Sequence, residues 1–562
     1  TNYTVNFTNA VTANNDTVTV ALKDDQNGQP ANLGGLILQD AKFEGFETVE
    51  IATETKAIGD GDFNIDGLFA GVDEDDNTLD DVETLNIKGD GGVSIGGSLS
   101  GLTTVDSSGA KGDVTINDIE NDDASLEGTA TTITLGEGDD TLSRVDVNGG
   151  KSSNNAVDNS LNAGGGDDTV NYDIDEGALF ANHKIEMGSG DDTLTVFDND
   201  NNTDDIDVTL GAGDDIVTLQ QDGGGGAVQL QDEDSVDGGA DFDTLALNNN
   251  TITKVEGTDS DSKDLQATLS GFEALRVINT LDNPAQAGNP VAEFDITDFG
   301  SSVNELQLDS TVAGTQTVKG FQSGATVGYR NDGDMVGTLN VDMEGATKAN
   351  TPNDTLNVNL NADLDGGGAP DNNDVNLGVD GINILNVTST DRANADDATE
   401  ADDGYTLSLT QEQNVDTINV DGDRGLDYLS SGRDAALSTI AAGSSSGDLG
   451  INLTAFSGTE GVDVTTGSGD DAIIGSSLQD TIVGGEGDDV IDGGATATAD
   501  TLTGGSGDDR FVFNPNASSD QAIDTVADYQ SGQASGDNDT LAFSTQNILG
   551  PSGSPVTGID VT

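Results

Sequence analysis

Several residue types are scarce in this chain of 562 residues, and each scarcity excludes a class of protein. Cysteine is absent, so neither a disulfide framework nor a thiolate metal site can be built. Lysine and arginine number 18 against 105 acidic residues, and a net charge of −87 would repel the phosphates of a nucleic acid. No run of about 20 apolar residues, the length of a membrane-spanning helix, occurs. We therefore expect neither nucleic-acid binding nor membrane insertion.

The shortage of histidine and large aromatic residues argues against an enzyme. His183 is the only histidine and is followed by Lys-Ile-Glu, so the His-Glu-x-x-His motif of zinc proteases is missing. Gly443-Ser-Ser-Ser-Gly447 matches the serine-hydrolase pattern formally, but the histidine precedes it, and Gly/Ser-rich turns match it easily. Acid pairs for glycoside hydrolysis are not excluded by motif, although sugar sites usually have aromatic platforms and the chain has no tryptophan. We expect no catalytic site, and we interpret His183 as an ordinary loop or strand residue.

Aspartate and glycine are abundant instead, with 84 and 76 copies, and valine, isoleucine and leucine occur in short alternating runs such as residues 17–22. Alternation is typical of half-buried strands, whereas glycine is costly inside helices. Low hydrophobicity with high charge is also the signature of disorder, and an acidic surface alone could indicate halophilic adaptation. We favour an all-β fold whose charge is neutralised by bound cations, because the strand pattern and the placement of aspartates in glycine-rich turns fit neither alternative.

The clearest repeat covers residues 466–512 and has a period of nine. Each unit resembles Gly-Gly-x-Gly-x-Asp-x-apolar-x, and the fourth unit is two residues longer. Glycines allow tight turns that expose carbonyl oxygens, and oxygen-only ligands select calcium. We expect successive turns to stack and to share several Ca2+ ions between neighbouring coils. The candidate ligand residues are Asp471, Asp480, Asp489, Asp500, Asp509, Gly467, Gly469, Gly485, Gly487, Gly505 and Gly507.

Related single turns of the form Gly-x-Gly-Asp-Asp end at Asp140, Asp168, Asp192 and Asp215, with a variant ending at Asp243. These aspartates are 28, 24, 23 and 28 residues apart, and a strand-like run follows each turn. The spacing predicts one coil of a larger solenoid per repeat, with the turns stacked along one edge. The preceding residues Asp139, Asp167, Asp191 and Asp214 are further candidate ligands, and weaker ones are Asp60, Asp62, Asp66, Asp332 and Asp334.

A third pattern, apolar-x-x-apolar-x-apolar, recurs in both halves of the chain, for example at residues 46–51, 82–87, 272–277 and 415–420. Its final alternation is typical of a strand with one face inward. Five blocks follow from the three patterns: an N-terminal β-solenoid (1–130), a solenoid with calcium turns (131–250), a second solenoid block (251–460), the nonapeptide β-roll (461–515) and a C-terminal β segment (516–562). The expected fold class is therefore all-β, a parallel β-roll or β-helix solenoid.

The nonapeptides resemble the repeats-in-toxin (RTX) superfamily, and residues 510–543 look like the segment that follows such repeats in proteins exported by type I secretion. The body of the chain is similar to RTX-type bacterial S-layer proteins. This resemblance implies calcium-bound parallel β-rolls, an extracellular location and calcium-dependent self-assembly on a bacterial surface. It also implies attachment to cell-surface polysaccharide, through a part that we do not recognise in this sequence.

From the residues and the resemblance together, we expect a structural surface-layer protein that folds and self-assembles outside the cell on binding Ca2+. The expected partner is a second copy of the chain, in a lattice or filament. The alternative is an RTX adhesin or biofilm-matrix filament protein that binds a foreign partner. Adhesins usually have long tandem domains and a distinct ligand module, and neither is evident here.

Overall fold

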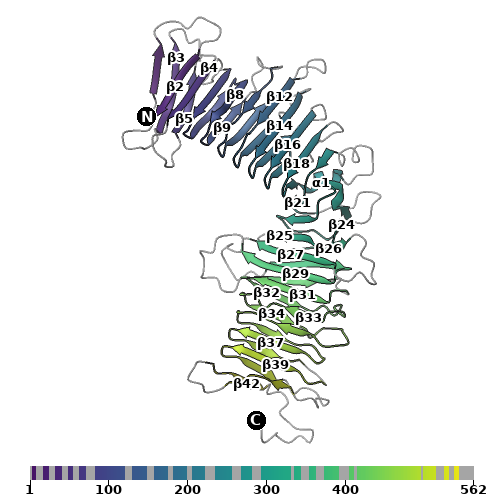
Figure 1. Cartoon of the computed structure of the whole chain (residues 1–562). Helices are drawn as coiled ribbons and strands as arrows, with labels where there is room; N and C mark the ends of the chain where they lie inside the picture. Colours follow the sequence, from purple (N-terminus) through teal and green to yellow (C-terminus); the bar gives the residue numbers. More distant parts are fainter. Residues whose placement is uncertain are drawn as a thin grey trace, which may run out of the picture. The chain divides into compact units, whose positions relative to one another are not determined.

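The computed structural model describes 21 segments of the chain that carry almost all of its regular structure. Every paired strand for which the partner residues are defined pairs in parallel, usually with the strand two positions away in the sequence (Figure 1). The predicted fold class, a parallel β-roll or β-helix solenoid, is confirmed. The described residues are 3–7, 17–23, 32–40, 48–54, 63–70, 83–120, 129–147, 157–174, 181–198, 205–221, 234–255, 268–281, 293–330, 335–343, 354–362, 373–391, 404–410, 414–494, 498–513, 524–530 and 537–543.

The chain divides into two compact units. The first unit contains Thr1–Arg276 and Asp298–Val303, and the second contains Val277–Thr297 and Asn304–Thr562. Their junction falls inside the 251–460 block of the sequence analysis, at β21 (Ala274–Val277) and the short 3-10 helix η1 (Ile296–Phe299). We describe each unit by itself.

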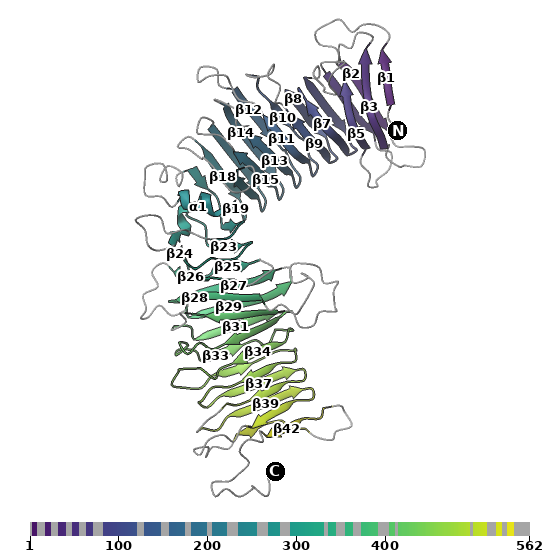
Figure 2. The same ribbon diagram turned by 180° about the vertical axis from the view of Figure 1, so that it is seen from behind.

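The first unit is built from two strands per coil, one in each of two sheets, and the two views show these strands as successive rungs (Figure 2). The odd-numbered strands form one sheet: β1 (Tyr3–Phe7), β3 (Asn32–Asp40), β5 (Phe63–Ala70), β7 (Val93–Ser100), β9 (Val114–Glu120), β11 (Thr141–Val147), β13 (Thr169–Ile174), β15 (Thr193–Asp198), β17 (Ile216–Gln220) and β19 (Thr244–Leu247). The even-numbered strands form the other: β2 (Thr17–Lys23), β4 (Thr48–Glu54), β6 (Thr84–Gly89), β8 (Thr104–Ala110), β10 (Thr132–Thr134), β12 (Val157–Asn162), β14 (Ala181–Ser189), β16 (Asp205–Ala212), β18 (Ser235–Ala240) and β20 (Leu269–Ser270). Helix α1 (Asn249–Val255) follows β19.

The second unit repeats this plan. Its odd-numbered strands are β23 (Glu305–Leu308), β25 (Ala325–Tyr329), β27 (Thr355–Ala362), β29 (Ile384–Asp391), β31 (Thr417–Gly422), β33 (Thr439–Ala441), β35 (Asp463–Thr465), β37 (Thr481–Glu486), β39 (Thr501–Ser506) and β41 (Thr525–Val526). Its even-numbered strands are β22 (Glu293–Asp295), β24 (Thr315–Phe321), β26 (Thr338–Met343), β28 (Asn373–Asp380), β30 (Gly404–Leu409), β32 (Gly425–Leu429), β34 (Leu449–Asn452), β36 (Ala472–Ile474), β38 (Val490–Asp492), β40 (Arg510–Phe513) and β42 (Thr540–Phe543).

Strict alternation along the strands builds the core of each coil. In β13 the side chains of Val170, Tyr172 and Ile174 are buried, whereas the residues between them are not. Because the strands pair in register, Val170 stacks on Leu194 of the next rung, and Leu194 stacks on Val217 of the one after. Burying such a side chain contributes roughly 1.5–3 kcal/mol, so these inward files hold neighbouring coils together.

Candidate metal-binding turns

The Gly-Asp turns of the first unit stack along one edge of the solenoid. Each turn leads directly into a strand of the odd-numbered sheet, and the first residues of these strands are in register, Thr141 with Thr169, Thr169 with Thr193, and Ile216 with Thr244. The repeats of 23 to 28 residues therefore form one coil each, as the spacing predicts. Sequence positions that are far apart thus form a continuous column of turns.

The last aspartates of these turns form a chain of hydrogen bonds through the protein interior, which we call the inner ladder. The backbone N–H of Asp140 donates to Oδ1 of Asp168 (2.7 Å), and that of Asp168 donates to Oδ1 of Asp192 (2.8 Å). Asp192 donates likewise to Asp215 (2.7 Å), and Asp215 to Asp243 (3.0 Å). All five side chains are at most 1% exposed. Each carboxylate therefore fixes the turn of the preceding coil.

The second oxygen of most inner-ladder carboxylates is buried without a hydrogen-bond partner. This holds for Oδ2 of Asp168, Asp192, Asp215 and Asp243. Burial, reinforced by neighbouring aspartates, raises the pKa of Asp168 to about 8 and that of Asp243 to about 7. Burial also raises the pKa of Asp192 and of Asp215 to about 6. A column of dry, unpartnered oxygens needs either protons or cations, because isolated buried carboxylates are very costly.

Asp140 is the exception in this column. Its Oδ1 accepts from the N–H of Val114 (2.6 Å), and its Oδ2 accepts from the N–H of Gly136 (3.2 Å). Burial still raises its pKa to about 6. At the other end, the N–H of Asp243 donates to Oε2 of Glu273 (3.0 Å), so a glutamate continues the ladder. Glu273 is not recognisable as a ladder residue from its sequence, because no Gly-Asp turn accompanies it.

The preceding aspartates of the turns form a second, solvent-exposed chain of hydrogen bonds, the outer ladder, which runs in the opposite direction. Here the N–H of Asp167 donates to Oδ1 of Asp139 (3.0 Å), and the N–H of Asp191 donates to Oδ1 of Asp167 (2.9 Å). Asp214 donates to Asp191 (2.9 Å) in the same way. These carboxylates cap backbone amides of the next coil. They are less suited than the inner ones to hold an ion away from water.

Glycine is required in these turns by both conformation and space. Gly188 and Gly190 have φ values of 116° and 130°, in the region that side chains disfavour. A side chain on Gly188 would also collide with the carbonyl oxygen of Gly164 in the adjacent coil. The variant turn has Asp241 in this region (φ 82°) and Phe242 at the outer-ladder position, so the outer ladder ends there without a carboxylate.

In the nonapeptide region of the second unit, consecutive turns do not stack as we expected. Strands β36, β38 and β40 pair in one sheet, and β35, β37 and β39 pair in the other. One coil therefore consumes two nonapeptides, and alternate turns lie at opposite edges. The period of nine sets the length of a half-coil, and it does not show which turns are neighbours.

Each edge has its own inner ladder. On one edge the N–H of Asp471 donates to Oδ1 of Asp489 (2.9 Å), and the N–H of Asp489 donates to Oδ1 of Asp509 (3.0 Å). Oδ2 of Asp471 and of Asp489 is buried without a hydrogen-bond partner, and burial raises the pKa of Asp489 to about 8. On the other edge Asp480 donates to Asp500 (2.9 Å).

The turn ending at Asp480 differs from the others because serine replaces glycine. The N–H of Ser476 donates to Oδ2 of Asp480 (2.7 Å), and the Ser476 hydroxyl contacts both oxygens (2.9 Å each). The N–H of Val462 donates to Oδ1 (2.7 Å). Protein donors thus already satisfy this carboxylate, which makes it the least suitable cation ligand of the nonapeptides.

The ladders continue beyond the residues that the repeat pattern identified. The N–H of Asp509 donates to Oδ1 of Asp539 (3.2 Å), and the N–H of Asp500 donates to Oδ1 of Asp524 (3.0 Å). Asp528 accepts from the N–H groups of Gly504 and Gly505. The sequence signal of Asp524 and Asp539 is an aspartate before a short apolar strand without the glycine turn. Asp60, Asp62, Asp332 and Asp334 lie outside the described residues, as does the side chain of Asp66.

The turn glycines named as candidate ligands line these edges. Gly485, Gly487, Gly505 and Gly507 have positive φ values between 116° and 140°. Side chains on Gly467 and Gly469 would crowd the carbonyl oxygens of Ser445 and Gly447. Backbone carbonyls of neighbouring coils therefore approach each turn closely.

These features fit a hard cation that is bound mainly by backbone oxygens. No group of three or more acidic, histidine or cysteine side chains converges anywhere in the described segments. Calcium takes six to eight oxygen ligands and accepts backbone carbonyls. The unpartnered Oδ2 that most of these turns provide, together with turn carbonyls, is the donor set that such an ion would use.

One other buried polar pair lies in the first unit. His183 of β14 is 1% exposed, and its Nδ1 is 3.0 Å from the hydroxyl of Tyr172 in β13. Burial lowers the pKa of His183 to about 4. The predicted place of this residue in a loop or strand is confirmed.

Comparisons with known proteins add no assignment: no protein-family model matches the chain, and a search of curated proteins finds no match. Within the described segments, no helix has both the length and the apolar character needed to cross a membrane.

Proposed function

We propose that this chain is a calcium-dependent structural protein of the RTX, surface-layer type, which folds and self-assembles outside the cell. One observation supports the calcium half of the proposal, which is that folding depends on bound calcium. Buried carboxylate oxygens without partners recur once per coil, at Asp168, Asp192, Asp215 and Asp243 and again at Asp471 and Asp489. A stable monomer without ligands would not bury charge repeatedly, because each case opposes folding.

The residues that would hold calcium are the inner-ladder aspartates together with the carbonyls of the surrounding glycine turns. Bound calcium supplies positive charge that keeps the buried carboxylates ionised. The chain supplies the alignment: Oδ1 of each aspartate is bonded to the neighbouring coil, so Oδ2 is held in place inside the turn. A ligand that binds only the folded state stabilises by about 2.7 kcal/mol per site at 100-fold excess over Kd.

Several such sites would together match the stability of a whole domain, which is about 5–15 kcal/mol. Calcium is scarce inside cells and abundant outside, so this coupling would keep a chain of charge −87 open before export and fold it afterwards.

A paired substitution tests the calcium half. Asp489→Ala removes an inner-ladder carboxylate, and Asp488→Ala removes its exposed neighbour of the outer ladder. We expect Asp489→Ala to shift the calcium midpoint of folding, followed by circular dichroism, to at least tenfold higher concentration, and Asp488→Ala to shift it little. Equal midpoints, or a fully folded wild-type chain in excess chelator at pH 7, would contradict the proposal.

Electron microscopy with and without calcium tests the assembly half. Ordered sheets or fibres of the purified chain support self-assembly. Monomers that associate only when a foreign surface or protein is added would favour the adhesin or biofilm-matrix alternative.

A further inference from the structure

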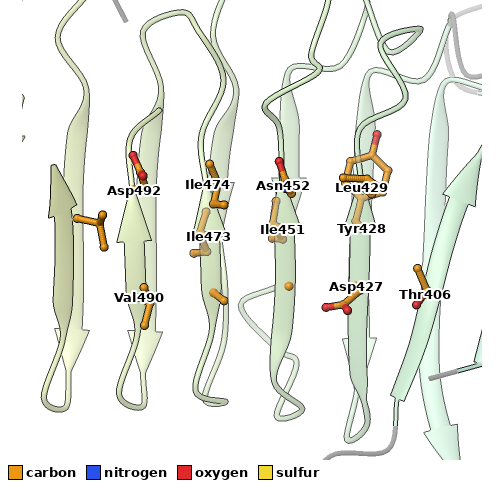
Figure 3. Close-up of a pocket in the computed structure, with 13 residues that line it drawn as sticks. Thr406, Asp427, Tyr428, Leu429, Ile451, Asn452, Ile473, Ile474, Val490 and Asp492 are labelled. Atoms are coloured by element: carbon orange, nitrogen blue, oxygen red, sulfur yellow. The ribbon is translucent and has the colours of Figure 1, made fainter. Parts of the chain in front are cut away.

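The outer face of the even-numbered sheet in the second unit has a shallow groove with an unusual sequence symmetry. Its hollow of about 480 Å³ crosses strands β30 to β40 (Figure 3). It exists because Gly450 and Ala472 present almost no side chain at its centre. Leu429, which is 51% exposed, and Ile474 give it an apolar lining.

Two files of outward residues run along this groove, as the strand register establishes. The first file, in order from β30 to β42, is Thr406, Asp427, Gly450, Ala472, Val490, Arg510 and Thr540. The second file, from β32 to β42, is Leu429, Asn452, Ile474, Asp492, Val512 and Ala542. Figure 3 shows the labelled members of both files on neighbouring strands.

We propose that this groove is a two-fold interface with a second copy of the chain, centred on β36. The proposal deepens the assembly half of the proposed function and rests on it only in requiring a folded chain. A two-fold axis along β36 would place each strand opposite the strand equally far on the other side, so β32 meets β40 and β34 meets β38. The resulting pairs are Asp427 with Arg510, Gly450 with Val490, Ala472 with itself, Leu429 with Val512, Asn452 with Asp492, and Ile474 with itself.

Each of these pairs is complementary. Asp427 meets the only cation of the two files, and neither Asp427 nor Arg510 has an ion pair within the described part of its own chain. The side chain of Val490 faces Gly450 of the second copy, and the remaining apolar residues face apolar residues of that copy. Two copies of a chain of charge −87 repel each other over most of their surface, so a face with matched charges is where they can meet.

In the free chain, the side chain of Asp427 occupies the space over Gly450. The Asp427 carboxylate lies over Gly450, where a side chain would collide with its Oδ1, and burial raises the pKa of Asp427. Pairing with Arg510 of the second copy would draw this carboxylate away and open the space over Gly450 to Val490. The same carboxylate would then face a cation instead of being partly buried without one.

The size of the face sets the expected affinity. Seven rungs at about 4.8 Å and two files cover about 29 Å by 13 Å, or about 800 Å² in total for both copies. This area lies below the range of stable complexes, about 1,200–2,000 Å². We expect weak association of the isolated chain, which becomes effective when many copies are held in one array.

A charge exchange tests the pairing in the full chain with millimolar calcium. Asp427→Arg would set two guanidinium groups against each other, and Arg510→Asp would set two carboxylates together. By sedimentation velocity over a concentration series, each single variant should weaken association at least tenfold, and the double variant should return to within about threefold of wild type. Asp342→Arg is the matched control, because it makes the same charge change on the same sheet outside the groove and should have no effect.

Cross-linking tests the register independently, since the chain has no native cysteine. Ala472→Cys lies on the proposed axis and should yield dimers with a short bifunctional thiol reagent, whereas exposed Thr501→Cys on the other sheet should not. Equal dimer yields from both variants, or single charge variants that associate like wild type, would overturn the interface. Ordered arrays that persist in Asp427→Arg would overturn it while leaving the proposed function intact. If the calcium titration fails as a test but the Asp427→Arg and Arg510→Asp variants behave as expected, the calcium proposal is overturned and the interface stands.

Discussion

Without calcium, the protein should be more stable in mild acid than at neutral pH. The perturbation is removal of calcium with a chelator, followed by a change of pH from 7 to 4.5. Burial raises the pKa of Asp192, Asp215 and Asp140 from 3.8 to about 6 and that of Asp168 to about 8. The folded chain thus holds these protons more tightly than the unfolded chain does. The stability that these bound protons contribute to the folded state is fully present below about pH 4 and is lost as pH rises through 6 to 8.

The size of this effect follows from the pKa values. One pKa unit corresponds to about 1.4 kcal/mol, so a carboxyl with a pKa of about 6 opposes folding by at most about 3 kcal/mol at pH 7. Relaxation of the turn around the ionised carboxylate reduces this to on the order of 2 kcal/mol. Five such carboxyls in the first unit therefore oppose folding by on the order of 10 kcal/mol, comparable with the total stability of a domain.

Circular dichroism and thermal unfolding in chelator are the assays, with high salt at pH 7 as a comparison. Salt screens the general repulsion of the acidic surface but does not protonate a buried carboxylate. We expect folding at pH 4.5 in chelator, and little recovery in salt at pH 7. Asp168→Asn should stabilise the calcium-free chain at pH 7 by about 2 kcal/mol and weaken calcium binding, whereas the exposed neighbour Asp167→Asn should do neither. A calcium-free chain equally stable at both pH values, or destabilised by Asp168→Asn, would refute the reasoning.

Two further predictions follow from single positions. Gly188→Ala should destabilise the calcium-loaded protein by about 1–3 kcal/mol in thermal unfolding, because Gly188 has a φ of 116° and a side chain there would collide with the carbonyl of Gly164. The control Gly443→Ala, whose side chain would meet only a methyl group at ordinary contact distance, should be near neutral. Equal effects of the two substitutions would contradict the requirement for glycine in the turn. Burial lowers the pKa of His183 to about 4, so the calcium-loaded protein should lose up to about 3 kcal/mol of its free energy of unfolding as pH falls from 6.5 to 4. His183→Gln should abolish this loss. A pH profile of the melting temperature that is the same for the variant and the wild type would count against this.

The fold was predictable because its two determining signals are local. Alternation in runs such as residues 169–174 fixes which side chains turn inward, and repeated Gly-Asp turns set where each coil bends. The spacing of Asp140, Asp168, Asp192 and Asp215 gave the length of a coil directly, since each coil contains one such turn.

What the sequence did not reveal depends on which segments become neighbours. A period of nine is compatible with turns stacked on one edge or alternating between two, and only strand pairing decides. Likewise, Asp539 and Glu273 join the ladders through long-range register without a motif of their own. The saturation of Asp480 by Ser476 follows from a hydroxyl that the repeat pattern treats as a variable residue.

The most direct test of the account is anomalous X-ray scattering from crystals of the calcium-loaded protein. The account predicts cations at about 2.4 Å from Oδ2 of Asp192 and of Asp489, with turn carbonyls completing the shell. Carboxylates at these positions that are protonated, hydrated or paired with lysine, with no ion nearby, would contradict it.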